Sequence, residues 1–162
     1  MPWGPNLITG DSSTFEGGTG DWAQIQPFDV FESSPLQAHS GSRSLRLLDG
    51  PPVTPRATIE LTGPDLIIDK TYRVSIWLKN AVGKINLEFY DAGGEPATPW
   101  INMTAPTWTQ FSTQLTCVTP GPCVIKLINT DPPSVTSQFV DDVALQKLIT
   151  ERPQYLPLLG VG

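Results

Sequence analysis

The frequency of proline is the feature that most limits what this chain can fold into. Its 162 residues include 17 prolines and 14 glycines, and proline interrupts helix interiors because it lacks the backbone donor. This density of breakers excludes a helical bundle or a coiled coil. The chain is also 39% hydrophobic, with five Trp and six Phe, which is enough apolar material for one core and argues against disorder.

Between the breakers, apolar and polar residues alternate with a period of two, which indicates half-buried β-strands. In residues 72–79 every second residue is apolar, and after a break at residues 80–83 the pattern resumes in residues 84–90. Further strands are expected at residues 44–48, 57–61, 109–115, 124–128 and 139–145. Short strands separated by Gly- and Pro-rich turns predict an all-β fold, an antiparallel β-sandwich.

Both ends of the chain differ from its middle. Residues 1–5 and 150–162 are rich in proline, apolar and without alternation, so we expect two arms on a sandwich of residues 6–149. Apolar arms need a surface to lie on, either the chain's own or a neighbour's, and we expect docking to another protein subunit of a larger assembly or to a second copy. The residues expected to contact that partner are Trp3, Tyr155, Leu156, Leu158 and Leu159.

The charge balance argues against nucleic acid as a partner. The chain has 10 basic and 16 acidic residues, a net charge of −6, and an acidic chain repels phosphate backbones. No apolar run approaches the roughly 20 residues that span a bilayer, so no membrane partner is expected. The N-terminus has neither the basic stretch nor the apolar stretch of a signal peptide, so we expect no export by a signal in this sequence.

The two cysteines, Cys117 and Cys123, flank the turn residues Val-Thr-Pro-Gly-Pro. Two thiols with no histidine nearby make a poor zinc site, which normally has four ligands. A disulfide across the turn and a pair of free thiols are both compatible with the spacing.

Five short segments, each weak alone, follow one another in a recognisable order. They are NLI with FEG at 6–8 and 15–17, AHSGSRSL at 38–45, YRVSIWLK at 72–79, WTQF at 108–111 and FVDDV at 139–143. The series resembles carbohydrate-binding modules of families four, nine and twenty-two. The resemblance covers about residues 6–147 and implies their galactose-binding-like jelly roll, a fold that hosts more than one function.

The resemblance also implies a structural calcium ion, which such modules commonly hold where three of these segments meet. The implied ligands are Glu16, Asp141 and the backbone around Ser40 and Ser42. The alternation of residues 139–145 independently turns Asp141 inward with Phe139, and a buried carboxylate needs a cation or several donors. Calcium prefers oxygen ligands of this kind. In the alternative, Asp141 caps loop amides or pairs with an arginine, Arg43.

Outward aromatic side chains among polar ones predict a glycan-binding surface, because sugar rings stack on exposed aromatic rings. Trp77 and Arg73 face outward in residues 72–79, and Glu88 and Tyr90 face outward in residues 84–90. With Trp100 on a Pro-rich loop, these are the expected glycan-binding residues. In the alternative, Trp77 lies beneath a loop, an arm or a protein partner.

Catalytic motifs are absent from the sequence, which has no G-x-S-x-G elbow, phosphate loop or histidine metal cluster. We expect the single histidine, His39, to make a structural hydrogen bond, and we expect no enzymatic activity. The expected function is a non-catalytic structural protein on a virion surface, a phage capsid-decoration or tail protein that is docked by its arms and contacts glycans. The alternative is a carbohydrate-binding module of a secreted glycoside hydrolase. A third reading is a small hydrolase that uses carboxylates such as Glu60 and Glu88.

Overall fold

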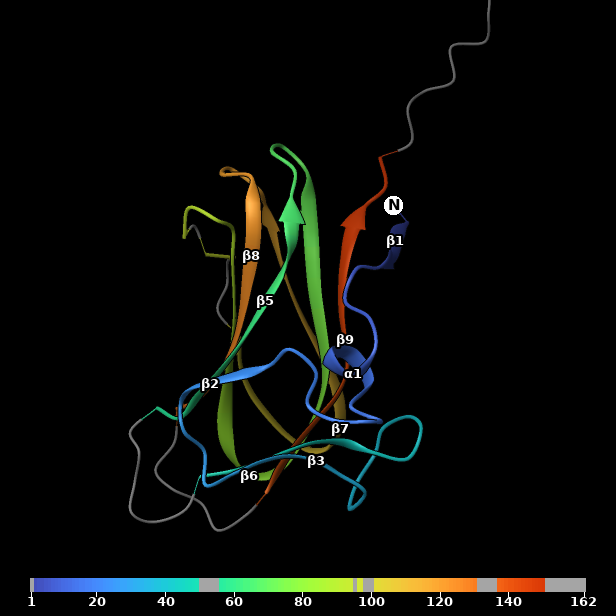
Figure 1. Cartoon of the computed structure of the whole chain (residues 1–162), viewed down its shortest axis with the longest axis vertical. Coiled ribbons are helices and arrows are strands. Elements are labelled where there is room, and N and C mark those ends of the chain that lie inside the picture. Colours follow the sequence, from blue (N-terminus) through green and yellow to red (C-terminus); the bar gives the residue numbers. More distant parts are fainter. Residues whose placement is uncertain (1, 50–55, 95, 98–100, 131–136, 151–162) are drawn as a thin grey trace, which may run out of the picture.

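The computed structural model describes residues 2–49, 56–94, 96–97, 101–130 and 137–150, which form a jelly roll of antiparallel strands with one short helix (Figure 1). In chain order the elements are β1 (Trp3–Asn6), α1 (Asp11–Thr14), β2 (Ala23–Gln26), β3 (Val30–Ser34), β4 (Ser44–Leu48), β5 (Thr58–Leu66), β6 (Thr71–Tyr90), β7 (Ile101–Thr116), β8 (Gly121–Asn129) and β9 (Gln138–Leu148). The predicted fold class, an all-β jelly roll, is confirmed. No helix of the described residues has the length and apolar character needed to cross a membrane.

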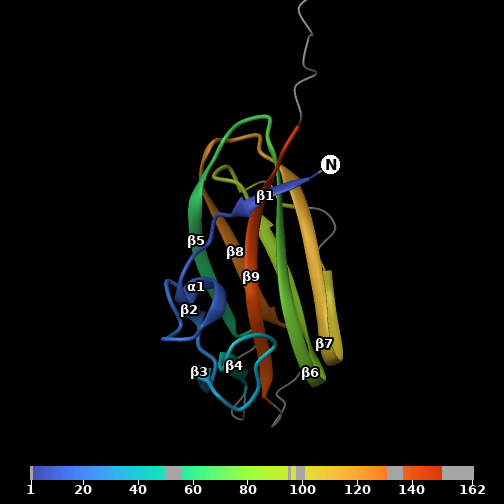
Figure 2. The same ribbon diagram turned by 90° about the vertical axis from the view of Figure 1, so that its right-hand side faces the viewer.

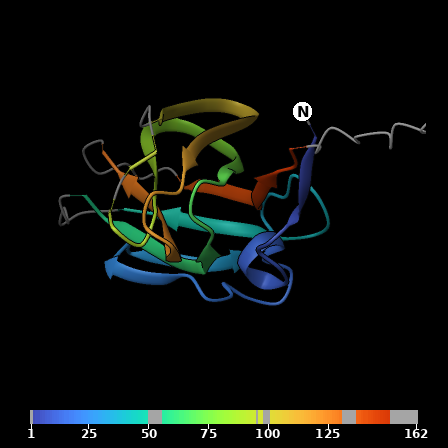
Figure 3. The ribbon, with the colours of Figure 1, turned by 90° about the horizontal axis from the view of Figure 1, so that it is seen from above.

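The strands form one sheet that curls upon itself. Their order is β2-β5-β8-β6-β9-β4-β3, with β7 paired to β6 and β1 paired to β9. Strand β6 changes neighbours along its length: residues 72–80 pair with β9, whereas residues 85–90 pair with β8. Strand β7 follows β6 through both parts, and Figure 3 shows the two strands curving together. Figure 2 shows the same sheet from the side. The two halves of the sheet enclose the core.

The core consists of the side chains that the alternation predicts to face inward. The inward apolar residues of both parts of β6 are at most 1% exposed, namely Tyr72, Val74, Ile76, Leu78, Ile85, Leu87 and Phe89. The predicted break at residues 80–83 is the bend between the two parts, where the pairing of β6 with β7 shifts register. Asn80 is buried there, and its side chain accepts from Ala105 N and donates to Met103 O. The amide therefore satisfies backbone groups that the bend removes from the ladder.

A bulge in β9 changes the predicted alternation of residues 139–145. Asp142 has a φ of 47°, and the pairing of β6 with β9 shifts register beside it. As a result Val140, Asp141 and Val143 are all fully buried, whereas Phe139 is only half-buried. The prediction that Phe139 faces inward is therefore wrong, because the extra residue of a bulge moves the following side chains to the other face. Asp141 is fully buried, but it pairs with the outward Trp77 and lies beneath the loop of His39 and Ser40, so its predicted inward orientation is wrong for the same reason.

The N-terminal residues belong to the sheet. Strand β1 pairs with the end of β9, with Trp3 opposite Leu148, and Ile149 N donates to Pro2 O at 3.0 Å. Residues 3–5, which we expect from the sequence to form part of an arm, thus satisfy backbone groups along the β9 edge. Residues 151–162 lie outside the described residues, and so do Trp100, Tyr155, Leu156, Leu158 and Leu159.

The two cysteines are free thiols, which is one of the two states that their spacing left open. Both are buried, and burial raises the pKa of each, for Cys123 to about 11. Cys123 lies against Gly63 of β5, where a Cβ atom would fall 2.6 Å from the sulfur. The thiols are therefore packing groups of the core, kept protonated at neutral pH.

Candidate functional site

The sandwich has two outer faces, and β6 contributes to both. We call the outer face of β2, β5, β8 and the second part of β6 the groove face, and the outer face of β3, β4, β9 and the first part of β6 the closed face. The predicted glycan-binding residues divide between them. Glu88 and Tyr90 lie on the groove face, whereas Arg73 and Trp77 lie on the closed face, so the structure does not bring these four residues together.

The groove face is hollowed along its length. Two adjoining depressions of about 450 and 370 Å³ share the side chains of Tyr90 and Lys126. Glu60 and Val124 line one of them, and Glu88 lines the other. The rest of this second depression is lined by residues of β2, β5 and β8 and by one residue that precedes β5, namely Ile25, Gln26, Thr58, Ile128 and Arg56. The result is an open groove that crosses three paired strands, with charged, aromatic and aliphatic side chains along it.

The centre of the groove is a fixed carboxylate. Glu88 is 5% exposed, and its Oε1 accepts a hydrogen bond from Asn86 Nδ2 at 2.8 Å. Its Oε2 accepts a short hydrogen bond from the Tyr90 hydroxyl. Burial and the adjacent Glu88 carboxylate raise the pKa of Tyr90 to about 12, so the phenol stays protonated. Glu88 therefore fixes the orientation of the Tyr90 ring that borders both depressions.

Lys126 adds a cation beside that ring. Its Nζ lies 3.5 Å from Glu60 Oε2 and 5.5 Å from the centroid of the Tyr90 ring. The groove thus offers hydrogen-bond donors and acceptors next to an aromatic face, which is the mixture that polar ligands with apolar ring faces require. Lys126 is not among the binding residues expected from the sequence. The alternation of residues 124–128 turns it outward, but the pairing of β8 with β5 and β6 that places it in the groove is not local in sequence.

On the closed face, the predicted platform residue is covered by another part of the chain. The His39 ring stacks on Trp77 with centroids 3.7 Å apart and planes inclined by 15°, and Trp108 meets His39 edge-on at 5.7 Å. The Arg73 guanidinium lies 4.4 Å from the Trp3 ring centroid and donates to the Gln146 side chain at 2.7 Å. Trp77 therefore follows the alternative reading, in which it lies beneath a loop.

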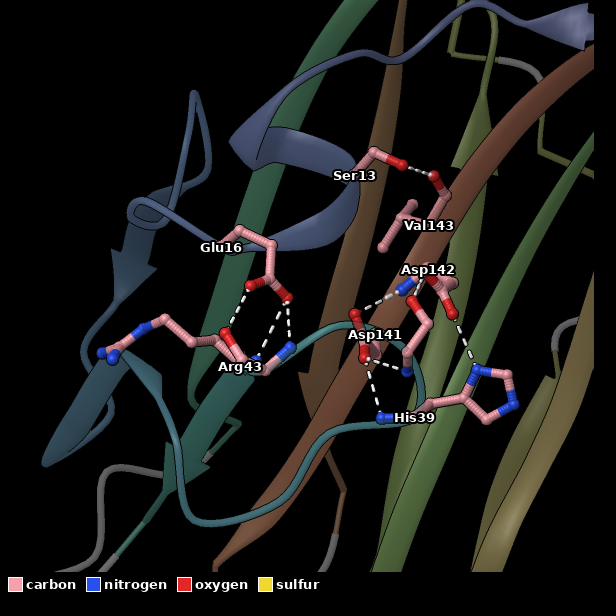
Figure 4. A network of polar contacts seen from close by, with 9 residues as sticks. Ser13, Glu16, His39, Arg43, Asp141, Asp142 and Val143 are labelled. Carbon is pink, nitrogen blue, oxygen red and sulfur yellow. Dashed lines mark hydrogen bonds and ion pairs between the residues drawn. The ribbon is translucent and has the colours of Figure 1, made fainter.

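The loop that covers Trp77 is held at one side by Glu16 (Figure 4). Glu16 Oε1 accepts from the backbone of Ser42 and Arg43 at 2.9 and 3.1 Å, and Oε2 accepts from the Ser42 hydroxyl at 2.7 Å. These hydrogen bonds lower the pKa of Glu16, and the two from Ser42 contribute most. Gly41 has a φ of +60°, and a Cβ atom there would lie 2.2 Å from Glu16 Oε1. The positive φ favours glycine, and a larger residue would displace the Glu16 carboxylate from the loop.

Asp141 holds the other side of the same loop (Figure 4). Its Oδ2 accepts from His39 N at 2.9 Å and Ser40 N at 3.1 Å, and its Oδ1 accepts from Asp142 N at 2.8 Å. Burial raises the pKa of Asp141, and the three N–H groups oppose that shift. His39 Nδ1 lies 2.7 Å from Asp142 Oδ2, so the expected structural hydrogen bond of His39 is confirmed.

These contacts bear on the predicted calcium ion. Ser40 and Ser42 turn N–H and hydroxyl donors toward Asp141 and Glu16, whereas calcium requires oxygen ligands. Within the described part of the chain no group of three or more His, Cys, Asp or Glu side chains could hold a metal ion. In this arrangement the predicted ligands do not fit a shared calcium ion, and the geometry favours the alternative, a carboxylate that caps loop amides. Calcium binding itself stays a prediction.

Comparison with known proteins identifies the fold. No protein-family model matches the chain, and no curated protein sequence matches it. A family 16 carbohydrate-binding module matches with a TM-score of 0.67 and 21% identity, over 86% of this chain and 99% of that chain. The CBM22-1 xylan-binding domain of Paenibacillus barcinonensis Xyn10C matches with a TM-score of 0.66 and 14% identity, over 93% and 99% of the two chains.

A third match lies within a larger protein. The enzymatically active domain of bacteriophage CBA120 tailspike protein 4 matches with a TM-score of 0.63 and 18% identity. The match covers 88% of this chain but only 21% of that chain. At these identities the matches show the fold alone. They confirm the predicted resemblance to the galactose-binding-like jelly roll of carbohydrate-binding modules.

Proposed function

We propose that this protein is a non-catalytic glycan-binding module that holds a carbohydrate chain along the groove face. The observation that carries the proposal is the Glu88–Tyr90 pair, which fixes an aromatic ring beside Lys126 in an open groove. The shared fold supports it, since a xylan-binding domain is among the proteins with this architecture.

The groove can recognise a sugar through two kinds of contact. The Tyr90 ring offers an apolar face to the C–H groups of a pyranose, while Lys126 and Glu60 reach hydroxyl groups beside it. Hydrogen bonds to charged groups are worth about 1.5–3 kcal/mol each when they are well made. Because Asn86 and Tyr90 already donate to its two oxygens, Glu88 acts as a positioning residue for the ring. We therefore infer binding without hydrolysis.

Affinity electrophoresis and calorimetry with soluble xylan, galactan and a β-glucan test this proposal. At least one polysaccharide should bind, and Tyr90→Ala should weaken that binding by about tenfold or more, which is about 1.4 kcal/mol. Trp77→Ala is the matched control, since it removes an aromatic ring from the closed face and should leave the affinity unchanged. Loss of binding in Trp77→Ala with retention in Tyr90→Ala would place the site on the closed face and contradict the proposal. The absence of binding to a full glycan array would overturn the proposal.

A second candidate, a component of a virion surface, is favoured by the match to part of a phage tailspike protein. In this role the module would be attached through its C-terminal residues, including Tyr155, Leu156, Leu158 and Leu159, and would present the groove to glycans. In the alternative it is a module of a secreted glycoside hydrolase. If the module is a virion component, truncation after Thr150 should abolish incorporation into purified particles while glycan affinity is retained. Incorporation at the wild-type level would remove this candidate and leave the hydrolase module.

A further inference from the structure

One end of the sandwich exposes a group of aliphatic side chains. The loop between β5 and β6 carries Ile67 and Ile68, which are 52% and 50% exposed, and the loop between β7 and β8 carries Val118, which is 62% exposed. The two loops are joined by hydrogen bonds from Asp69 N to Cys117 O and from Cys117 N to Lys70 O, both 2.9 Å long. Single exposed apolar residues are common, but here three lie on two loops that are hydrogen-bonded to each other.

The chain leaves the sandwich at this same end. Tyr72 pairs with Lys147, so the last residues of β9 lie beside the start of β6, and Thr71 pairs with Thr116 of β7. Figure 1 shows both loops and the end of β9 together at the top of the molecule. Ile149, which is 43% exposed, follows β9 directly. We call Ile67, Ile68, Val118 and Ile149 the end patch.

The sequence that follows is suited to cover such a surface. Residues 155–161 read Tyr-Leu-Pro-Leu-Leu-Gly-Val and contain no charged residue. The five residues 150–154 that connect them to Ile149 can span about 16 Å when extended. Neighbouring strands are about 4.8 Å apart, so the step from β9 across β6 to the β7–β8 loop is about 10 Å. The connection is therefore long enough, and its proline at position 153 limits the conformational freedom that docking removes.

We propose that residues 155–161 dock on the end patch of their own chain. The tether starts at the edge of the patch, which keeps the apolar segment at a high effective concentration there, above what a second copy supplies in dilute solution. The docked segment would cover the four aliphatic side chains and explain why a soluble domain carries them together at one end. This surface is separate from the groove face, so the proposal does not depend on glycan binding, and it is an alternative to attachment of the same segment to a particle.

Cysteine cross-linking of the full chain tests the proposal. In Ile68→Cys/Leu158→Cys the two new thiols should form a disulfide within one chain under mild oxidation, read as a loss of two alkylation sites in the monomer band. The rate should exceed by about tenfold that of Leu36→Cys/Leu158→Cys, because docking raises the local concentration of one thiol near the other. Leu36 is a distant control: it is 61% exposed and lies in the loop whose His39 stacks on Trp77, far along β6 from Tyr72. Because the nearby tether alone favours Ile68, the dye measurement after truncation separates docking from proximity. Cys117 and Cys123 are buried, so neither should react with the alkylating reagent or the new thiols.

Three results are distinguishable. Faster intramolecular bonding in the Ile68 variant, together with increased binding of a hydrophobic dye after truncation at Thr150, would support the proposal. Equal rates in the two double variants would overturn it. Disulfide-linked dimers whose yield rises with protein concentration would also overturn it, because the segment would then dock on a second copy.

Discussion

The closed face and the groove face are built from the same strand, yet their outward side chains have different surroundings. On the closed face, the His39 ring stacks on Trp77 and the Trp3 ring lies against Arg73, so segments distant in sequence partly cover both side chains. On the groove face, Tyr90 and Glu88 bond to each other and border an open hollow. An outward aromatic residue is therefore available to a ligand only where the rest of the chain leaves it uncovered.

The largest effect is expected at Asp141, whose loss should affect the closed face alone. Asp141→Asn removes the charged acceptor of three partly buried N–H groups and replaces one of its two oxygens by an amide donor. We expect the free energy of unfolding to fall by about 2–4 kcal/mol, measured by urea denaturation. Asp142→Asn, at the half-exposed neighbour, should cost about 1 kcal/mol or less. The groove should keep its glycan affinity, and a parallel loss of affinity would show that the two faces are coupled.

Trp77→Ala is expected to have the next largest effect on stability. It removes a half-buried ring together with its stack on His39, so thermal or urea unfolding should show a loss of about 1–3 kcal/mol. Gln110→Ala, an exposed polar truncation on the adjacent strand, serves as the control and should stay within about 0.5 kcal/mol of wild type. A stable Trp77→Ala protein would mean that the His39 loop adds little to the closed face.

The contribution of the Glu16 carboxylate to the stability of the closed face should depend on pH, and Glu16→Gln measures it. The folded-state pKa of Glu16 is lowered by the Ser42 and Arg43 donors, so its contribution is present above the unfolded pKa of about 4.3 and is lost as the pH falls through the folded pKa. The melting temperature of the variant should therefore lie below that of wild type near neutral pH. The two should converge in acid. A constant difference at all pH values would show that packing, and not the carboxylate charge, holds the loop.

The smallest effect is expected from removal of divalent cations. Because N–H and hydroxyl donors already satisfy Glu16 and Asp141, the melting temperature should be the same with EGTA as without it. A fall that added Ca²⁺ restores would instead support the calcium ion predicted from the family resemblance, since a ligand bound only to the folded state stabilises it. Elemental analysis of the protein as purified provides an independent measurement.

Local alternation predicts much of this fold and only part of the site. It predicts β4 at its observed bounds, the inward residues of both parts of β6, and the outward positions of Trp77, Glu88 and Tyr90. It does not predict which outward residues share a face, because that depends on the bend at residues 80–84. For the same reason it groups Trp77 with Tyr90 and misses Lys126. Strands β1 and β3 lack alternation and β2 alternates over only four residues, so none of the three is predicted.

The position of β9 determines when this sandwich can close during synthesis. Although it is the last strand of the described residues, β9 lies between β4 and β6 and also pairs with β1, so contacts such as Leu45 with Val140 join residues nearly a hundred positions apart. Contacts of such long sequence separation slow folding. A nascent chain that ends before residue 138 lacks the centre of one half of the sheet, exposes the β4 and β6 edges, and should be digested rapidly by protease until residue 148 has been added. The half of the sheet that contains β4 and β9 can therefore form only after β9 has been synthesised.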